Sequence, residues 1–322
     1  MRTVYLATSD FAVTVLERLA ASDHRPRLVV TRPDRPRGRG RRLSPPPVAE
    51  AARVLGTELA QPEKVNSPEA RELIAAARPD AVVVCAFGAL IAEPLLSAHE
   101  MVNVHPSLLP RWRGAAPIER AIEAGDEVTG VSIMRPIPEL DAGPVCLARA
   151  EPIRPDDDFG TLSRRLAELG GELLVEALDR RPEFVEQPEE GVTIAAKIDA
   201  AERRLDPERW GAVELERRVR ALTPHVGAWI ELPGADRLGV RCARAVAGDG
   251  APDPAAAPPG TLDAGADGRL LLACARGVLE LVEVQPTGGR PMPAADWLRG
   301  RGNELVGLAG STAADPGRRL DR

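Results

Sequence analysis

The stretch AVVVCAF, Ala81 to Phe87, is a continuous apolar run of strand length that is followed by Gly88. Such a run is typical of a strand that is buried on both faces of a sheet. Other strand-like runs precede it (RTVYLAT, RLVVT) or follow it (MVNVHP, GVSIMRP), and segments with helical spacing such as FAVTVLERLAAS and PIERAIEAG separate them. This alternation predicts an α/β fold, a Rossmann-like and mostly parallel sheet with helices on both faces.

The length of 322 residues is sufficient for about two domains. We expect the first domain to cover residues 1–188, and the polar, largely non-periodic segment 189–206 to be a linker. A helix from about Ala212 to Leu222 then precedes short strands that Gly and Pro clusters divide. This pattern predicts a small, mostly antiparallel, OB-like β-barrel over residues 207–310. Residues 311–322 are expected to be a disordered tail.

The composition, 44% hydrophobic and 28% charged, is that of a soluble globular protein. No apolar run approaches the ~20 residues that cross a bilayer, and the start does not resemble a signal peptide, so we expect a cytosolic protein without a membrane span. The four cysteines and four histidines show no metal-ligand spacing. GRGRRLS lacks the spacing of a phosphate-binding loop, and no GxGxxG follows the first strand. We therefore expect no metal and no nucleotide cofactor.

Polar side chains follow two of the predicted strands. In MVNVHP, Asn103 and His105 are two residues apart, so both point to one face near the end of the strand. Asp141 lies in the loop PELDAGPV after the next strand. A lone histidine at a strand end is more often structural, but with Asn103 and Asp141 nearby it can serve acyl transfer to a nitrogen. Asn103 and a protonated His105 can donate to the oxyanion, while Asp141 orients His105 and accepts a proton from the amine. No residue type stands out as a covalent nucleophile.

Positive charge is concentrated in one short region of an otherwise acidic protein with net charge −6. Between Arg25 and Arg42 there are eight arginines and one acidic residue, Asp34. A local basic patch can bind a polyanion whatever the net charge. A solvated, arginine-rich loop is the alternative interpretation.

The motifs NVHPSLLPRWRGAAPIERAI, TGVSIM and LDAGPV together resemble the family of formyltransferases that use 10-formyltetrahydrofolate. The resemblance covers nearly the whole chain. TRPDRPRGRGRRLSPPPV and the second domain, with ELERRVRALTPHVGAWIEL and ELVEVQPTGGRPM, resemble the members that formylate methionyl initiator tRNA. The resemblance implies 10-formyltetrahydrofolate as co-substrate, initiator methionyl-tRNA as the partner, and no obligatory protein partner.

The resemblance also implies roles for single residues. Asn103, His105 and Asp141 match the catalytic trio of the family. The implied folate-binding residues are Ser107, Leu108, Leu109 and Pro110 in the SLLP segment, and Phe87, Gly88 and Leu90 in the loop after the apolar run. The implied tRNA-binding residues are Arg35, Arg37, Arg39, Arg41 and Arg42, and Phe11 matches a position near the methionyl group. The second domain is close to neutral by count, so we expect its contribution to tRNA binding to be positional more than electrostatic.

Two other functions stay open from the sequence. A formyltransferase of the same superfamily could act on a small amine, such as an amino sugar nucleotide, and would need the trio without the basic loop. A non-catalytic RNA-binding protein on the same fold would not need an intact trio.

Overall fold

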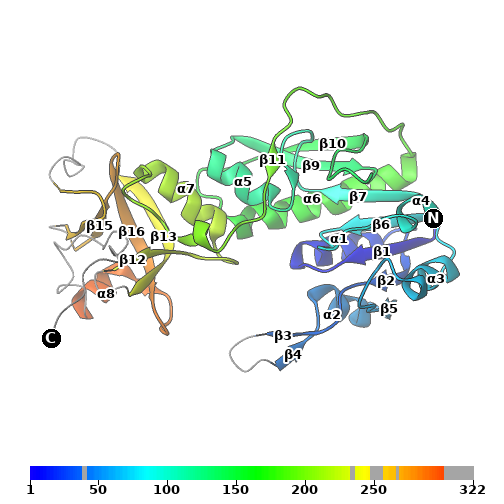
Figure 1. Ribbon diagram of the computed structural model, residues 1–322, viewed down its shortest axis with the longest axis horizontal. Helices are drawn as coiled ribbons and strands as arrows, with labels where there is room; N and C mark the ends of the chain where they lie inside the picture. Colours follow the sequence, from blue (N-terminus) through cyan, green and yellow to red (C-terminus); the bar gives the residue numbers. More distant parts are fainter. Residues whose placement is uncertain (38–41, 233–235, 247–256, 266–267, 301–322) are drawn as a thin grey trace, which may run out of the picture. The chain divides into compact units, whose positions relative to one another are not determined.

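A computed structural model describes residues 1–37, 42–232, 236–246, 257–265 and 268–300. The chain forms two compact units, both shown in Figure 1. Unit 1 comprises Met1–Ala121, Asp126–Pro155 and Thr161–Lys197, and unit 2 comprises Ile122–Gly125, Asp156–Gly160 and Ile198–Arg322. The predicted tail, 311–322, lies outside the described residues. Within those residues, no helix has both the length and the apolar character that a membrane span requires.

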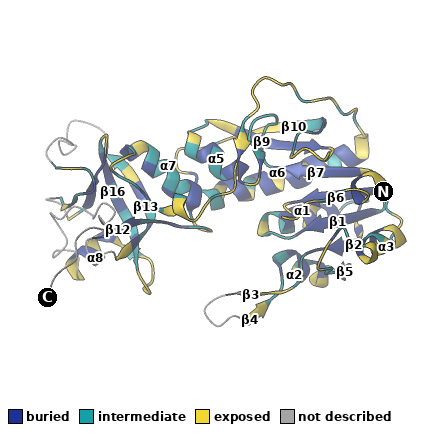
Figure 2. Ribbon diagram, viewed as in Figure 1, coloured by how far each residue is buried: buried dark blue, intermediate teal, exposed yellow. Residues whose placement is uncertain are grey.

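Unit 1 is built on a seven-stranded sheet of order β10-β9-β7-β6-β1-β2-β5. Its strands are β1 (Thr3–Ala7), β2 (Pro26–Val30), β5 (Glu58–Ala60), β6 (Ala81–Cys85), β7 (Met101–His105), β9 (Val128–Met134) and β10 (Val145–Pro152). The five strands from β5 to β7 are parallel. The predicted Rossmann-like, mostly parallel sheet is confirmed, and the stretch AVVVC forms its buried strand β6 (Figure 2).

The last two strands of this sheet depart from the simple alternation of parallel strands and helices. β9 runs antiparallel to β7, with His105 opposite Ser132 and Asn103 opposite Met134, and β10 is antiparallel to β9. The reason is that the connection that leaves the carboxyl end of β7 enters β9 at that same end of the strands. The segment GVSIMRP is therefore a strand, as predicted, but its end lies away from the end of β7.

Helices cover both faces of the sheet. The helices that lie wholly or mostly in unit 1 are α1 (Asp10–Ala20), α2 (Pro47–Val54), α3 (Pro68–Ala76), α4 (Leu95–Ala98), α5 (Pro117–Ala124) and α6 (Phe159–Arg180). At Gly170 of α6 an added Cβ would lie 2.9 Å from a methyl group of Val104, so α6 packs closely on that face of β7. Ile74 of α3 and Leu95 of α4 pack with Val82 and Val84 on the other face. The chain order reverses between β1 and β6, which is where open α/β sheets place their binding crevice.

Two short pairings complete unit 1. β3 (Arg35–Arg37) and β4 (Arg42–Ser44) form an antiparallel hairpin that projects from the end of β2 (Figure 1). β8 (Arg113–Gly114) pairs in parallel with β11 (Ile194–Ala195). The second pairing ties residues of the predicted linker to unit 1, although their polar, aperiodic sequence gave no sign of it.

Unit 2 contains an antiparallel sheet of order β12-β13-β16-β15-β14, with β17 paired to β16. A short 3-10 helix (Ala201–Arg203) opens the main segment of this unit. It is followed by α7 (Ala212–Leu222), β12 (Ala228–Glu231), β13 (Arg237–Val246), β14 (Leu262–Ala264), β15 (Leu270–Ala273), β16 (Val278–Pro286), β17 (Met292–Pro293) and α8 (Ala294–Gly300). Leu215, Val219 and Leu222 of α7 share one buried core with the sheet. The antiparallel sheet and its register shifts in β13 agree with the predicted small barrel.

Candidate active site

The face of β7 on which Asn103 and His105 lie is set by the alternation of the strand. Val104 points toward α6, so the residues on either side of it point to the opposite face. Asn103 pairs with Val84 of β6, and β1, β6 and β7 end at the same edge. The carboxyl end of β7 therefore presents an amide and an imidazole beside the crevice position of the sheet.

The imidazole of His105 is held from both sides. The ring is buried, with Nε2 2.9 Å from the carbonyl oxygen of Trp112 and Nδ1 3.6 Å from Oδ2 of Asp141. A carbonyl oxygen can only accept, so Nε2 carries a proton and donates it to Trp112. The Nδ1 edge, where the separation from the carboxylate exceeds a hydrogen bond, is the edge that remains for a reacting group.

Asp141 reaches His105 through a loop that turns back toward the end of β7. The carboxyl end of β9 lies opposite Asn103, so the loop between β9 and β10 must return along the sheet to bring Asp141 to the ring. Oδ2 of Asp141 also accepts a hydrogen bond of 2.9 Å from the backbone N–H of Gly114. The expected meeting of His105 and Asp141 is thus observed, but by a different path from the neighbouring strand ends that the sequence suggested.

Asn103 shares the face of His105 and has a weak partner of its own. Its Nδ2 lies 3.7 Å from the sulfur of Met134. A thioether is a poor acceptor, so the amide can transfer its hydrogen bond to an oxyanion at little cost. The site therefore holds one loosely engaged donor, one imidazole and one carboxylate.

The SLLP segment forms a tight turn directly after β7. The hydroxyl of Ser107 is fully buried and donates to the carbonyl oxygen of Arg111 at 2.6 Å. Ser132 of β9 donates to the carbonyl of Ser107 at 2.8 Å and accepts from the N–H of Leu109 at 3.2 Å. The hydroxyl of Ser107 therefore holds the turn in place. The side chains left partly exposed are Leu108, Leu109 and Pro110.

The loop after β6 lies next to this turn because β6 and β7 are parallel neighbours. Phe87 is buried, whereas Gly88 and Leu90 are exposed. The hydroxyl of Thr8, just after β1, donates to the carbonyl of Phe87 at 2.8 Å, which links this loop to the start of α1 and to the half-buried Phe11. The residues expected to bind folate and the methionyl group thus follow β7, β6 and β1 in turn.

The hairpin contains the arginines that the sequence singled out. Arg35 and Arg42 are exposed, and Arg37 pairs with Arg42 in the hairpin register. Arg39 and Arg41 lie outside the described residues. Asp34, the acidic residue next to Arg35, accepts a hydrogen bond from Gln61 at 2.7 Å. The hairpin follows β2, and so leaves the same edge of the sheet as the loops described above.

A second concentration of positive charge lies in unit 2. A groove of about 530 Å³ there is lined by Arg203, Arg237 and Arg241 together with Trp229. The guanidinium of Arg237 stacks on the ring of Trp229 at 4.2 Å, and Arg241 donates to Gln285. Among the described residues that line this groove, none has a carboxylate. The near-neutral count of the second domain therefore conceals a local basic surface.

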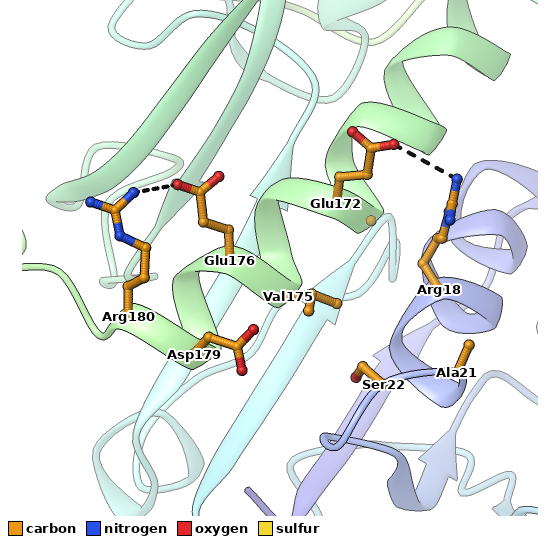
Figure 3. Close-up of a pocket in the computed structure, with 9 residues that line it drawn as sticks. Arg18, Ala21, Ser22, Glu172, Val175, Glu176, Asp179 and Arg180 are labelled. Carbon is orange, nitrogen blue, oxygen red and sulfur yellow. Dashed lines mark hydrogen bonds and ion pairs between the residues drawn. The ribbon is translucent and has the colours of Figure 1, made fainter.

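A depression of about 480 Å³ beside α1 and α6 has a different character (Figure 3). Both of its arginines are ion-paired with glutamates of α6, Arg18 with Glu172 at 3.7 Å and Arg180 with Glu176 at 2.5 Å. It lies on the face of the sheet that α6 covers, which is opposite to His105. This depression is therefore separate from the candidate site.

Matches with known proteins cover both units. The model of the formyl transferase family matches residues 1–178, and the model of its C-terminal domain matches residues 197–302. A methionyl-tRNA formyltransferase of Halorhodospira halophila is 46% identical over 309 residues, 93% of this chain and 96% of the relative. One of Ruegeria pomeroyi is 43% identical over 304 residues, 93% and 97% of the two chains. The chain belongs to the methionyl-tRNA formyltransferase family.

A solved structure agrees with this family at the level of the fold. HypX from Aquifex aeolicus in complex with tetrahydrofolic acid superposes with a TM-score of 0.61 at 19% identity, covering 100% of this chain and 50% of HypX. At that identity the likeness extends to the fold alone.

The thiols of this family member are unsuited to nucleophilic attack. Burial raises the pKa of Cys85 to about 12, and burial likewise raises the pKa of Cys274 to about 12. The pKa values of the half-buried Cys146 and Cys242 are also raised, again chiefly by burial. The thiolate is the nucleophilic form of cysteine, and a raised pKa leaves little of it. The raised pKa values therefore favour direct transfer over a cysteine-bound intermediate.

Several residues that build the site were not singled out in the sequence. Ser132 could have been found, because the alternation of GVSIM places it on the face of its partner His105. Gly114, Gln187 and Thr193 could not, because they act through backbone positions and through contacts between segments far apart in the chain.

Proposed function

We propose that this protein transfers the formyl group of 10-formyltetrahydrofolate to the α-amino group of methionyl initiator tRNA, giving N-formylmethionyl-tRNA. The observation that carries this proposal is the identity of 43% and 46% to methionyl-tRNA formyltransferases over both units of the chain. The contact of His105 with Asp141 at the crevice edge of the sheet supports it.

The catalytic roles follow from the positions of the polar atoms. As the amine attacks the formyl carbon, negative charge develops on the formyl oxygen, and the amide of Asn103 and the Nδ1 edge of His105 can donate to it. Asp141 stabilises the protonated imidazole and accepts a proton from the attacking amine. The N–H of Gly114 keeps one oxygen of that carboxylate in place. When the adduct collapses, the bond between the formyl carbon and N10 of the folate breaks, and the proton held by Asp141 passes to N10 so that tetrahydrofolate leaves.

The folate co-substrate is assigned to the loops beside His105. Partly exposed Leu108, Leu109 and Pro110, with the exposed Leu90 and Gly88, form apolar edges suited to a flat heterocycle. HypX, which shares this fold, was determined with tetrahydrofolic acid. Folate supplies the activated formyl group, and this chain's residues hold and orient it. The hydrogen bonds of Ser107 and Ser132 fix the turn that carries Leu108, Leu109 and Pro110 directly after β7.

The tRNA is assigned to the two basic surfaces. Arg35, Arg37 and Arg42 of the hairpin, with Arg39 and Arg41 of the same loop, would contact the acceptor end through its phosphates. Phe11, half-buried at the start of α1, would lie near the methionyl side chain. The groove of Arg203, Arg237 and Arg241 adds phosphate contacts in unit 2, and Trp229 adds an aromatic face. The docking role of unit 2 is thereby electrostatic as well as positional.

The alternative is a formyltransferase that acts on a small amine such as an amino sugar nucleotide. Such an enzyme would need the trio but neither basic surface. The identity of the relatives across unit 2 therefore favours the tRNA substrate over this alternative.

The test is a direct comparison of acceptors with the full-length protein and 10-formyltetrahydrofolate. We expect rapid formyl transfer to charged initiator tRNA, slower transfer to charged elongator tRNA, and negligible transfer to free methionine or to amino sugar nucleotides. Rapid turnover of a small amine without any preference for tRNA would exclude the proposed function.

A further inference from the structure

The turn that carries Asp141 is not stable by its own local conformation. Asp141 has φ +49°, in the left-handed region that side chains other than Gly seldom adopt. Such a conformation is strained for a residue with a side chain and persists where its surroundings hold it. Gly143, two residues on, leaves no room for a side chain because an added Cβ would meet the carbonyl oxygen of Arg135. The position of the carboxylate therefore depends on contacts from outside the turn.

Gln187 supplies such contacts. Its Nε2 donates to the carbonyl of Asp141 at 2.8 Å and to the carbonyl of Gly143 at 2.7 Å. Its Oε1 accepts from Nε of Arg113 at 2.9 Å. One side-chain amide thus joins the turn of Asp141 to the strand β8, whose next residue, Gly114, donates to the Asp141 carboxylate. All its polar atoms are used in this clamp.

The same segment also holds the other side of the imidazole. We call residues 185–195 the strap. Thr193 of the strap accepts from the N–H of Trp112 at 2.8 Å, and the carbonyl of Trp112 is the partner of Nε2 of His105. Trp112 itself has φ +64° and so also needs outside support. The strap therefore fixes the partners of both ring nitrogens of His105, through Gln187 at one end and Thr193 at the other.

We propose that Gln187 is a positioning residue for the formyl-transfer step: its amide clamps the turn of Asp141 and thereby sets the carboxylate against His105. This inference rests on the proposed function. The Gln187 amide donates to the backbone carbonyl of Asp141, so its effect on the carboxylate passes through the Asp141 backbone. A small displacement of a positioned group can lower the rate on the order of tenfold to a hundredfold.

The variants Gln187→Met and Gln187→Glu test the clamp. Methionine has a similar length but cannot donate, and glutamate keeps the acceptor for Arg113 while losing both donors. We expect each to lower kcat about tenfold, with KM for methionyl-tRNA and for folate changed less than about twofold. If Gln187→Glu has wild-type kcat, the contact with Arg113 is the one that matters and the clamp on Asp141 is refuted.

A double-mutant cycle separates positioning from general loss of structure. In an Asp141→Asn background, we expect Gln187→Met to change kcat less than about twofold, because its effect passes through the lost carboxylate. An equal loss of kcat in both backgrounds would overturn the proposal. Thr3→Val is the control, because it removes a buried hydrogen bond of 2.7 Å to the carbonyl of His24 in the same unit. It should lower the urea midpoint without lowering kcat.

The ring signals of His105 give a readout that does not need turnover. With four histidines in the chain, the ¹⁵N signals of His105 can be assigned with His105→Gln. We expect Gln187→Met to shift the Nδ1 signal of the unliganded protein, and Thr3→Val to leave it in place. If the wild type fails to formylate methionyl-tRNA, the proposed function fails, whereas an unmoved Nδ1 signal refutes the clamp itself.

Discussion

Charged groups are paired at the carboxyl ends of the strands around His105, but they are left without a carboxylate in the described part of the groove of Arg203, Arg237 and Arg241. At the edge, the imidazole and the carboxylate face each other and backbone partners at 2.9–3.6 Å. In the groove, three guanidinium groups gather without a carboxylate among the described lining residues. A group that must act on one atom gains from being fixed beforehand. A surface that binds a polyanion gains from charge that is left uncompensated. Variants around His105 should therefore affect kcat, and variants in the groove should affect the Kd for tRNA.

The largest effect is expected at His105 and Asp141. His105→Ala or Asp141→Asn should lower kcat on the order of a hundredfold or more, because proton transfer and oxyanion stabilisation are lost, while tRNA affinity stays near normal. Single-turnover rates and tRNA binding, measured on the same samples, check both statements. Equal losses in rate and in binding would indicate a structural histidine.

The molecule offers a matched control for this pair. His24 is also a buried histidine with an aspartate partner, Nε2 lying 2.7 Å from Asp179. It precedes β2, away from the edge where β7 ends. His24→Ala should reduce the urea midpoint and leave kcat within about twofold of the wild type. A large loss of kcat in this variant would mean that removing any buried histidine inactivates the enzyme.

Gly114→Ala tests whether the fixed geometry of the edge depends on a close backbone approach. Gly114 has φ +124°, and an added Cβ would lie 2.7 Å from the carbonyl oxygen of Ala195. We expect a loss of roughly 1–3 kcal/mol in the free energy of unfolding and a lower kcat, because the N–H that holds Asp141 must shift. Urea unfolding and kcat check these effects.

Gly56→Ala is the comparison for Gly114→Ala. Gly56 also has a positive φ, +64°, but an added Cβ would meet nothing within 4 Å. This variant should lower stability through backbone strain with kcat unchanged. If both variants lose activity alike, the approach of Ala195 to Gly114 is not what positions Asp141.

The sequence predicted these regions to different extents, for physical reasons. Asn103 and His105 were predictable because strand alternation fixes the face of every second residue, and AVVVCAF identified the neighbouring strand. Gln187 and Thr193 were not, because side chains that bond to distant backbone groups leave no periodic pattern. The groove was missed for a similar reason: Arg203, Arg237 and Arg241 are brought together only by folding. The basic character of the arginine loop was predictable because its arginines lie close together in the sequence, whereas the pairing of β3 with β4 was not predicted.

The groove gives the next prediction. Replacing Arg203, Arg237 and Arg241 by alanine should raise the Kd for initiator tRNA on the order of tenfold, with kcat at saturating tRNA unchanged. Each lost phosphate contact lowers the slope of log Kd against log salt by about 0.7–0.9. Filter binding across a salt series measures both quantities.

The control for the groove removes the same charge elsewhere in unit 2. Arg269, Arg276 and Arg299 each form an ion pair with a carboxylate, of Glu280, Glu214 and Asp296 respectively. Their triple alanine variant should change the tRNA Kd less than the groove variant. If the two triple variants weaken binding equally, overall charge rather than the groove accounts for the affinity.

The smallest effect is expected for a double alanine variant of the hairpin. This variant decides whether the hairpin binds tRNA or is a solvated loop. Arg35→Ala with Arg42→Ala should raise the tRNA Kd about threefold to tenfold and lower the salt slope by up to about 1.4–1.8, since both side chains are exposed and free to reach phosphates. Arg18→Ala with Arg180→Ala removes the same charge from the ion-paired depression on the face that α6 covers, and should leave the slope unchanged. An unchanged slope for the hairpin variant would assign these arginines to solvent. Arginines would then contribute to tRNA affinity only where folding brings them together away from carboxylates.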